Sequence, residues 1–274
     1  MCRSLTSLTI PDGVTSIEGW AFSNCTSLTS TNIPNSVTSI GNQAFTNCPL
    51  LTNITLPSNL TSIGNGAFNS CKSFTSITIP ESVTEIGSNV FGYCTSLEAF
   101  YGKFASDDNR CLVIDGELNS FAPAGLTSYI IPNGVISIGE SAFCMCSSLT
   151  SVTIPESVTE IGDGAFRYCD SLTSITIPDS VTLIGATAFG DCKLLENITI
   201  PEKVTLIDTW AFINCASLTT IYVKSLTPPT MSDSDPFSDC NSLSKIYVPS
   251  ASVNAYKAAK GWKEYAEYIE GYNF

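Results

Sequence analysis

Histidine is absent from this sequence of 274 residues. Without an imidazole the chain has no Ser-His or Cys-His nucleophile system and no histidine metal ligand. It also carries no phosphate-binding glycine loop and no dinucleotide-binding fingerprint. We therefore expect a protein that is not an enzyme and that uses no cofactor or metal.

Basic residues are scarce, since 12 Lys and Arg stand against 25 Asp and Glu and leave a net charge of −13. Nucleic acids and anionic membranes both attract basic surfaces, so we expect neither as a partner. No apolar run approaches the length of about 18 residues that a membrane-spanning helix needs. We expect no direct insertion into a membrane.

What the sequence does contain is a repeat of 23 residues. Proline recurs at Pro11, Pro34, Pro57, Pro80, Pro132, Pro155, Pro178 and Pro201. Phenylalanine recurs at Phe22, Phe45, Phe68, Phe91, Phe143, Phe166, Phe189 and Phe212. Cysteine recurs at Cys2, Cys25, Cys48, Cys71, Cys94, Cys146, Cys169, Cys192 and Cys215. A period of this length indicates one supersecondary unit copied and stacked, which is a solenoid.

Residues 172–192 give the clearest single coil. Ile175 and Ile177 alternate with polar residues and predict a short strand with one buried face, which Pro178 ends. Residues 181–184 predict a second short strand, and Gly185 then allows the chain to turn. Residues 186–192 are too few for an independent helix, so we expect one turn of α or 3₁₀ helix.

The repeat resembles the BspA-like leucine-rich repeats of bacterial and protist surface proteins. Segments 79–87 and 154–162 carry the resemblance, since both read I-P-E-S-V-T-E-I-G. The fold expected is mainly β with short helical turns, a leucine-rich-repeat solenoid with a 23-residue period over 1–224. Residues 225–274, similar to the family's usual ending, would form a degenerate repeat and a C-terminal cap.

The resemblance implies a non-catalytic module of the cell surface or of a secreted protein. Such a module would adhere to host or microbial surface proteins, with a protein or glycoprotein as ligand. The alternative is a structural stalk or spacer in a larger surface protein, with ligand binding elsewhere.

The chain opens at Met1 already inside a repeat, with Cys2 in phase, and shows neither a signal peptide nor an N-terminal cap. We infer a fragment whose export signal and cap lie upstream, and a cytoplasmic protein is the alternative. An uncapped first coil could also pair end to end with a second molecule.

The nine cysteines of the repeat occupy a core position beside the phenylalanine column. We expect reduced, buried thiols there, because parallel Cβ vectors suit disulfide geometry poorly. Cys240 follows the same column with a slip of two residues. Cys111 and Cys144 are out of phase, and we expect these two to be exposed or paired.

The period breaks once, where the stretch 97–126 is longer than a repeat. Residues 111–118 predict a β-hairpin with a tight Asp115-Gly116 turn. Just before it lie four candidate partner-binding residues, Tyr101, Lys103, Phe104 and Arg110, because insertions often carry contacts. The alternative is that Phe104 and its neighbour Phe100 fill the core of a degenerate coil.

The outward face of the first strand carries a column of threonines that ends in Tyr222 and Tyr247. Threonine neighbours pack well across strands, so the column itself indicates sheet stabilisation. The two tyrosines are further partner-binding candidates, because tyrosine is enriched at interfaces.

In the tail, Ser250 or Ser252 could cap a short helix through Lys260. Four aromatic residues would then cover the last coil, namely Tyr256, Trp262, Tyr265 and Tyr268. A weak calcium site at Asp233, Asp235 and Asp239 stays an alternative to the expected absence of metal, although the loop lacks the glycine and the terminal glutamate of a calcium hand.

Overall fold

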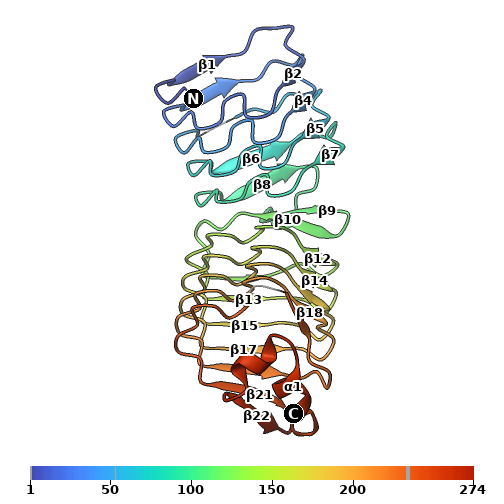
Figure 1. Ribbon diagram of the computed structural model, residues 1–274. Helices are drawn as coiled ribbons and strands as arrows, with labels where there is room; N and C mark the ends of the chain where they lie inside the picture. Colours follow the sequence, from blue (N-terminus) through green and yellow to red (C-terminus); the bar gives the residue numbers. More distant parts are fainter. Residues whose placement is uncertain (1, 53, 233–234) are drawn as a thin grey trace. The chain divides into compact units, whose positions relative to one another are not determined.

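The computed structural model describes residues 2–52, 54–232 and 235–274, in two compact units of residues 1–125 and 126–274. Each unit is a stack of short coils joined by parallel strands (Figure 1). Most strand partners are 23 residues apart, as in the pairing of Ser7 with Ser30 and of Ser151 with Ser174. The predicted mainly-β solenoid of 23-residue period is confirmed.

Unit 1 (residues 1–125) contains two series of strands and a hairpin. The first series is β1 (Ser7–Thr9), β3 (Ser30–Asn32), β6 (Ser76–Ile79) and β8 (Ala99–Gly102). The second series is β2 (Ser16–Ile17), β4 (Ser39–Ile40), β5 (Ser62–Ile63) and β7 (Glu85–Ile86). The hairpin consists of β9 (Cys111–Ile114) and β10 (Glu117–Phe121).

Unit 2 (residues 126–274) repeats the two series and adds a cap. The first series is β11 (Ser128–Ile130), β13 (Ser151–Thr153), β15 (Ser174–Thr176), β17 (Asn197–Ile200), β19 (Thr220–Val223), β21 (Lys245–Pro249) and β22 (Ile269–Tyr272). The second is β12 (Ser137–Ile138), β14 (Glu160–Ile161), β16 (Leu183–Ile184), β18 (Leu206–Ile207) and β20 (Thr230–Met231). The cap contains two 3₁₀ turns, η1 (Ser250–Ser252) and η2 (Trp262–Tyr265), and the helix α1 (Val253–Ala258).

Alternation sets the register of the first series. In β15 the side chain of Ile175 is buried between two exposed neighbours and pairs with Val152 of the coil before it. A slip of one residue would expose the whole apolar column, so the register is strongly specified. Pro178 follows β15, as the sequence predicts.

The third side of each coil is built from tight turns. The helical turn predicted over 186–192 is wrong at this point, because Thr187 and Asp191 have φ of 51° and 60°, which interrupt a right-handed helix. The N–H of Phe189 instead donates to the Ala211 carbonyl of the next coil at 2.7 Å. Phe189 and Cys192 face the interior, as predicted.

Gly185 is required by a close approach between coils. Its φ lies outside the left-handed region, so the turn itself does not demand glycine. A Cβ on Gly185 would lie 2.8 Å from the backbone N of Asp163 and 2.6 Å from its Oδ1. The Gly185 N–H donates to the Ile161 carbonyl at 2.8 Å, so glycine permits the two backbones to pair at this corner.

Stacked phenylalanines form the centre of the core in each unit. In unit 2 the ring centroids of Phe166 and Phe189 lie 5.3 Å apart, and those of Phe189 and Phe212 lie 5.2 Å apart. In unit 1 Phe45 and Phe68 stack in the same way at 5.5 Å. No coil could bury this column alone, which is why stacking stabilises the fold.

Cys111 and Cys144 are buried, so of the two predicted alternatives, exposed or paired, exposure is wrong. Cys111 belongs to the inward face of β9, opposite Phe121. Cys144 occupies the turn position that glycine takes in a later coil, at Gly190, where an added Cβ would meet Ile213 at 3.0 Å. That position is crowded, which explains the burial of Cys144.

The predicted hairpin is confirmed. Asp115 and Gly116 both have positive φ, of 50° and 86°, which is the geometry of a type I′ turn. Antiparallel pairing of Glu117 with Ile114 encloses those two residues.

The cap differs from its prediction in two details. Helix α1 ends at Ala258, before the predicted Lys260. Ser252 precedes α1, but its side chain makes no capping bond and donates to the Leu226 carbonyl at 2.7 Å. Helix α1 contacts β21 and β22, and Figure 1 shows it beside those strands. Tyr256 and Trp262 are fully buried there, in the covering role the sequence predicts.

Candidate functional site

Four aromatic side chains gather on the outward face of β19, β21 and β22. The rings of Tyr222 and Tyr247 stack with centroids 5.2 Å apart. Tyr272 meets both, at 5.7 Å from Tyr222 and 5.4 Å from Tyr247. Phe274 packs edge-on against Tyr272 at 5.0 Å. We call these four residues the aromatic cluster.

Strand register places the aromatic cluster. Thr199 of β17 pairs with Tyr222, and Tyr222 pairs with Tyr247, so the tyrosines continue the outward threonine column. Tyr272 lies two residues beyond Glu270, which pairs with Tyr247, and therefore faces outward as well. Tyr272 and Phe274 are 44% and 53% exposed, whereas Tyr222 and Tyr247 are half-buried by their own stacking.

Polar groups border the aromatic cluster. Lys245 of β21 forms an ion pair with Glu270 of β22. The Ser250 hydroxyl donates to Asn273 Oδ1 at 2.9 Å. An exposed apolar centre with a polar rim is the composition of a protein interface.

The candidate residues of the stretch 97–126 lie in different surroundings from the aromatic cluster. Tyr101 in β8 is 46% exposed and faces outward. Lys103 Nζ donates to the Val83 carbonyl at 2.6 Å and lies 5.0 Å from the Phe104 ring centroid. Phe104 has φ of 69° and packs, partly buried, against the core of unit 1. Lys103 and Phe104 are therefore engaged in internal contacts.

Arg110 also makes internal contacts. Its Nη1 donates to the carbonyls of Ala122 and Ala124, at 3.3 and 3.0 Å. Leu112 of the hairpin belongs to the core of unit 1, and Leu118 is fully buried as well. Asn119 of β10 is buried too, and its Nδ2 donates to the Gly87 carbonyl at 3.0 Å. Phe100 is fully buried, as the alternative interpretation of this stretch expected.

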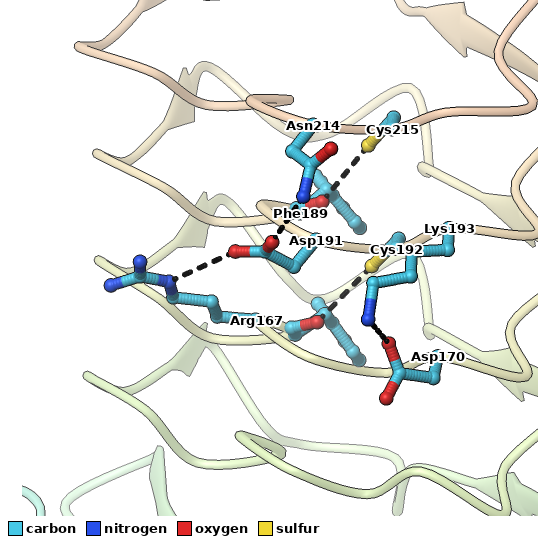
Figure 2. Close-up of polar contacts among 9 residues, drawn as sticks. Arg167, Asp170, Phe189, Asp191, Cys192, Lys193, Asn214 and Cys215 are labelled. Atoms are coloured by element: carbon cyan, nitrogen blue, oxygen red, sulfur yellow. Dashed lines mark hydrogen bonds and ion pairs between the residues drawn. The ribbon is translucent and has the colours of Figure 1, made fainter. Parts of the chain in front are cut away.

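A polar column runs along the third side of unit 2, and Figure 2 shows its contacts. Asn214 Nδ2 donates to Asp191 Oδ1 at 2.7 Å, and Arg167 Nε lies 3.6 Å from Asp191 Oδ2. Lys193 and Asp170 form a second ion pair at 3.0 Å, with both side chains largely exposed. Because these groups pair with one another between coils, we interpret the column as structural.

The thiol column has a role that the sequence did not reveal. Most Sγ atoms of the column donate to the phenylalanine carbonyl of the coil before, as Cys192 does to Phe166 at 3.2 Å and Cys215 to Phe189 at 3.1 Å (Figure 2). The Phe166 carbonyl also accepts from the Cys169 N–H at 3.3 Å, so the Cys192 thiol gives it a second donor, which alanine or valine could not supply. Burial raises the pKa of Cys94 to about 12, so this thiol is neutral and not poised as a nucleophile.

No group of three or more metal-ligating side chains occurs among the residues that the structure describes. Asp235 Oδ1 accepts from the Phe237 N–H at 2.9 Å and from the Tyr265 hydroxyl at 2.5 Å, so that oxygen serves the cap. Asp233, the third member of the predicted calcium alternative, lies outside the described residues. Within the same residues, no helix is long and apolar enough to cross a membrane.

Sequence reasoning missed Tyr272 and Phe274, because both follow the end of the repeat. The one signal in the sequence is the high density of aromatic residues in 262–274. It predicts that these side chains cover the last coil. Tyr256 and Trp262 do so, but the last two aromatics lie outside.

A family model for the BspA-type leucine-rich repeat region, with six copies, matches residues 1–106 and 117–244. The chain belongs to this family. Its members are repeat scaffolds, typically non-catalytic, and the solenoid described above is their architecture.

Solved structures give the same picture. A leucine-rich cell surface protein from Faecalibacterium prausnitzii is 25% identical, with a TM-score of 0.57 over 98% of this chain and 92% of its own. A leucine-rich repeat protein from Eubacterium ventriosum is also 25% identical, with a TM-score of 0.66 over 88% and 72% of the two chains. The pneumococcal vaccine antigen PcpA, at 19% identity and a TM-score of 0.69, covers 98% of this chain with 78% of its own and shows the fold alone. No curated protein matches the chain.

Proposed function

We propose that this chain is a non-catalytic repeat module that binds a protein or glycoprotein at a cell surface. The aromatic cluster carries the proposal. Across the outward sheet of unit 2 the coils before β19 supply serine, threonine and asparagine, apart from the exposed Ile130, and form a largely polar face of low adhesiveness. At β19–β22 that composition changes to three tyrosines and a phenylalanine that adhere to each other and remain partly open to solvent.

Stability alone does not account for the aromatic cluster. The column of Thr153, Thr176 and Thr199 serves the same positions in earlier coils of the sheet face. Exposing Tyr272 and Phe274 to water is unfavourable for isolated apolar rings, and tyrosine-rich patches are where interface energy concentrates. Contact with a partner is what would bury them.

An extracellular location forms part of the proposal. It is supported by the family and by the neighbour from Faecalibacterium prausnitzii, which is described as a cell surface protein. Adhesion to host or microbial surface proteins is the finer form of the proposal, with the ligand defined by experiment.

The test uses a panel of purified extracellular-matrix glycoproteins immobilised on biosensor tips. We expect saturable binding to at least one, weakened at least about tenfold in the double variant Tyr222→Thr/Tyr247→Thr. Threonine is the matched replacement because it occupies the same column in earlier coils. Tyr101→Ser, an exposed tyrosine in unit 1, is the control and should bind as the unaltered chain does.

Two outcomes would overturn the proposal. Binding that survives in Tyr222→Thr/Tyr247→Thr would remove the aromatic cluster from the interface. The absence of saturable binding to every glycoprotein, and to intact epithelial and bacterial cells, would remove the binding function.

A structural stalk is the second candidate, favoured by the uniform ladders between coils. Thr182 Oγ1 donates to the Thr159 carbonyl at 3.2 Å, and Thr205 Oγ1 repeats the contact with Thr182 at 3.3 Å. These hydroxyls tie each coil to the one before it, which is useful in a spacer. The stalk function is favoured if ligand binding in a longer surface protein maps outside residues 1–274.

A further inference from the structure

The sequence contains two Asn-Gly pairs, Asn65-Gly66 in unit 1 and Asn133-Gly134 in unit 2. In such a pair the backbone nitrogen of glycine can attack the side-chain amide of asparagine, because glycine has no Cβ to obstruct the approach. In a folded protein the reaction also requires that the glycine N–H and the asparagine amide are not held by other contacts. The two pairs differ in this respect.

Asn133 and Gly134 lie at an exposed corner between β11 and β12. The Val135 N–H donates to the Pro132 carbonyl at 3.4 Å and closes a four-residue turn. The N–H of the third residue has no role in such a turn, and that residue is Gly134, with φ of 94°. A Cβ built on Gly134 would meet no atom within 4 Å. The Gly134 nitrogen is therefore open to water and to the side chain beside it.

Hydrogen bonds leave both reacting groups of this corner unoccupied. Among the residues that the structure describes, the Gly134 N–H and the Asn133 side chain have no hydrogen-bond partner. Ser157, one coil further on, donates its hydroxyl to the Val135 carbonyl at 2.6 Å. The serine thus serves the turn but not the nitrogen that would react.

The equivalent corner of the first coil has the same turn with its nitrogen held. Val14 N–H donates to the Pro11 carbonyl at 3.3 Å, and Gly13 has φ of 98°. Here the Gly13 N–H donates to Ser36 Oγ at 3.1 Å. Asp12 takes the place of asparagine, so the first coil supplies a matched site in which the glycine nitrogen is occupied.

The pair Asn65-Gly66 is held on both sides. Asn65 Oδ1 accepts from the Ser88 N–H at 2.9 Å, and the Gly66 N–H donates to the Ser88 carbonyl at 3.0 Å. Gly66 is also buried. The asparagine amide is fixed and the glycine nitrogen is occupied, so this pair is protected while its coil is folded.

We propose that Asn133-Gly134 is a site of spontaneous deamidation in the folded protein, with water as the co-reactant. The Gly134 nitrogen gives its proton to hydroxide and forms a bond to Asn133 Cγ. The bond from Cγ to Nδ2 breaks, and the amide nitrogen takes a proton from water and leaves as ammonia. The product of this step is a five-membered succinimide.

Water then opens the succinimide in one of two ways. Addition at Cγ breaks the new bond and gives aspartate in an ordinary chain. Addition at the backbone carbonyl carbon gives isoaspartate, in which the chain continues through the side chain. The sum is asparagine and water to a carboxylic acid and ammonia, with no oxidant or reductant.

Either product adds a negative charge at a corner where other coils already carry a carboxylate. Those residues are Asp12, Glu81, Glu156, Asp179 and Glu202. The aspartate product should therefore keep the fold, since it reproduces the Pro-Asp-Gly-Val sequence of the first coil. Isoaspartate lengthens the backbone by one carbon and should weaken the turn from Pro132 to Val135. This inference goes beyond the proposed function and does not depend on the aromatic cluster.

The experiment incubates the purified full chain at mildly alkaline pH with a reductant, once folded and once unfolded in guanidinium chloride. Peptide mapping by mass spectrometry follows the gain of about 1 Da at each Asn-Gly pair. In the folded chain we expect Asn133 to react at least about tenfold faster than Asn65, which reacts only after local opening. In the unfolded chain the two rates should agree within about threefold.

Two results would overturn the proposal. Equal rates at Asn65 and Asn133 in the folded chain would show that the contacts at Ser88 give no protection. An unmodified Asn133 in the folded chain, under conditions in which the unfolded chain reacts, would show that the corner does not permit the attack.

Variants of the first coil test the contact at the glycine nitrogen. Asp12→Asn gives that corner the Pro-Asn-Gly-Val sequence of residues 132–135 while Ser36 still holds the Gly13 N–H. We expect this site to react at least about fivefold more slowly than Asn133, and Asp12→Asn/Ser36→Ala to recover most of the difference. Equal rates in the single and the double variant would contradict the assigned role of the nitrogen contact. Asn133→Gln should abolish the reaction at its corner and leave the urea midpoint unchanged.

Discussion

The stretch 97–126 of unit 1, which we call the hairpin segment, and the aromatic cluster of unit 2 have similar compositions. Their side chains differ in whether they make internal contacts or face solvent. Both place aromatic rings near basic residues in an acidic chain, with Lys103 and Arg110 in the first and Lys245 at the border of the second. In the hairpin segment, Lys103 and Arg110 donate to backbone carbonyls and Phe104 packs on the core. In the aromatic cluster, the rings contact one another and face outward. Composition alone singles out both regions. The contacts of the side chains show that the hairpin segment has a structural role and that the aromatic cluster is available to a partner.

The difference has a physical origin in how each segment interrupts the repeat. The insertion at 97–126 must satisfy the backbone of a coil that lost its regular neighbours, so long side chains donate to free carbonyls such as that of Ala124. The strands β19–β22 keep their ladder, so their outward positions have no such task. Freedom from a structural role is what leaves a side chain available to a partner.

The largest expected effect on the free energy of unfolding comes from one of two adjacent residues of β8. Phe100 is fully buried and meets Phe91 edge-on at 5.4 Å, so Phe100→Ala should lower the free energy of unfolding by about 3–5 kcal/mol. Tyr101 is exposed, and Tyr101→Ala should change it by less than about 0.5 kcal/mol. Urea titration followed by circular dichroism measures both. Equal effects would mean that the strand does not alternate as described.

Arg110 gives the next effect. Arg110→Leu keeps the apolar stem but removes two donors, so the free energy of unfolding should fall by about 1–3 kcal/mol as the Ala122 and Ala124 carbonyls lose a partner. Glycoprotein binding should be unaltered. Arg3→Leu, an exposed arginine at the start of the same unit, is the matched control. A loss of binding without a loss of stability would return Arg110 to the interface.

Alkaline pH should destabilise the interior. Burial raises the pKa of Cys48 to about 11 and of Cys94 to about 12 from the ordinary 9.0. The unfolded chain releases these protons first, so stability is complete below about pH 9 and falls as pH rises toward 11–12. Urea midpoints across that window measure the fall, and Cys94→Ala should reduce its slope. Midpoints that rise with pH would contradict the buried thiol column.

The smallest effect belongs to the rim of the aromatic cluster. Lys245 and Glu270 are both more than 40% exposed, so Lys245→Ala should change the free energy of unfolding by about 0.5 kcal/mol or less. The same urea titration measures this change, and a loss of several kcal/mol would contradict an ion pair open to solvent.

Much of the fold was predictable because the repeat fixes inward positions. The inward placement of Phe189 and Cys192 and the Asp115-Gly116 hairpin turn follow from spacing and turn chemistry alone. The thiol donors and the close approach at Gly185 were not predictable, since both depend on where the neighbouring coil lies. The phase of Cys144 predicts a cysteine that is exposed or paired, because phase alone does not reveal the crowding of the turn.

The candidate site was predictable only in part. Tyr222 and Tyr247 stood out because they break a threonine column whose register the repeat defines. Tyr272 and Phe274 follow no repeat, so their contact with that column required the position of β22. The internal partners of Arg110 are backbone carbonyls, which sequence composition does not reveal.

The most direct measurement compares two variants on the same matrix glycoprotein and in the same urea titration. For Tyr272→Ser/Phe274→Ser we predict binding weakened at least about tenfold, with a free energy of unfolding changed by less than about 1 kcal/mol. For Arg110→Leu we predict unchanged binding and the loss of stability given above. The reverse pattern, with binding lost in Arg110→Leu and kept in the aromatic variant, would contradict the assignment of the aromatic cluster as the binding surface.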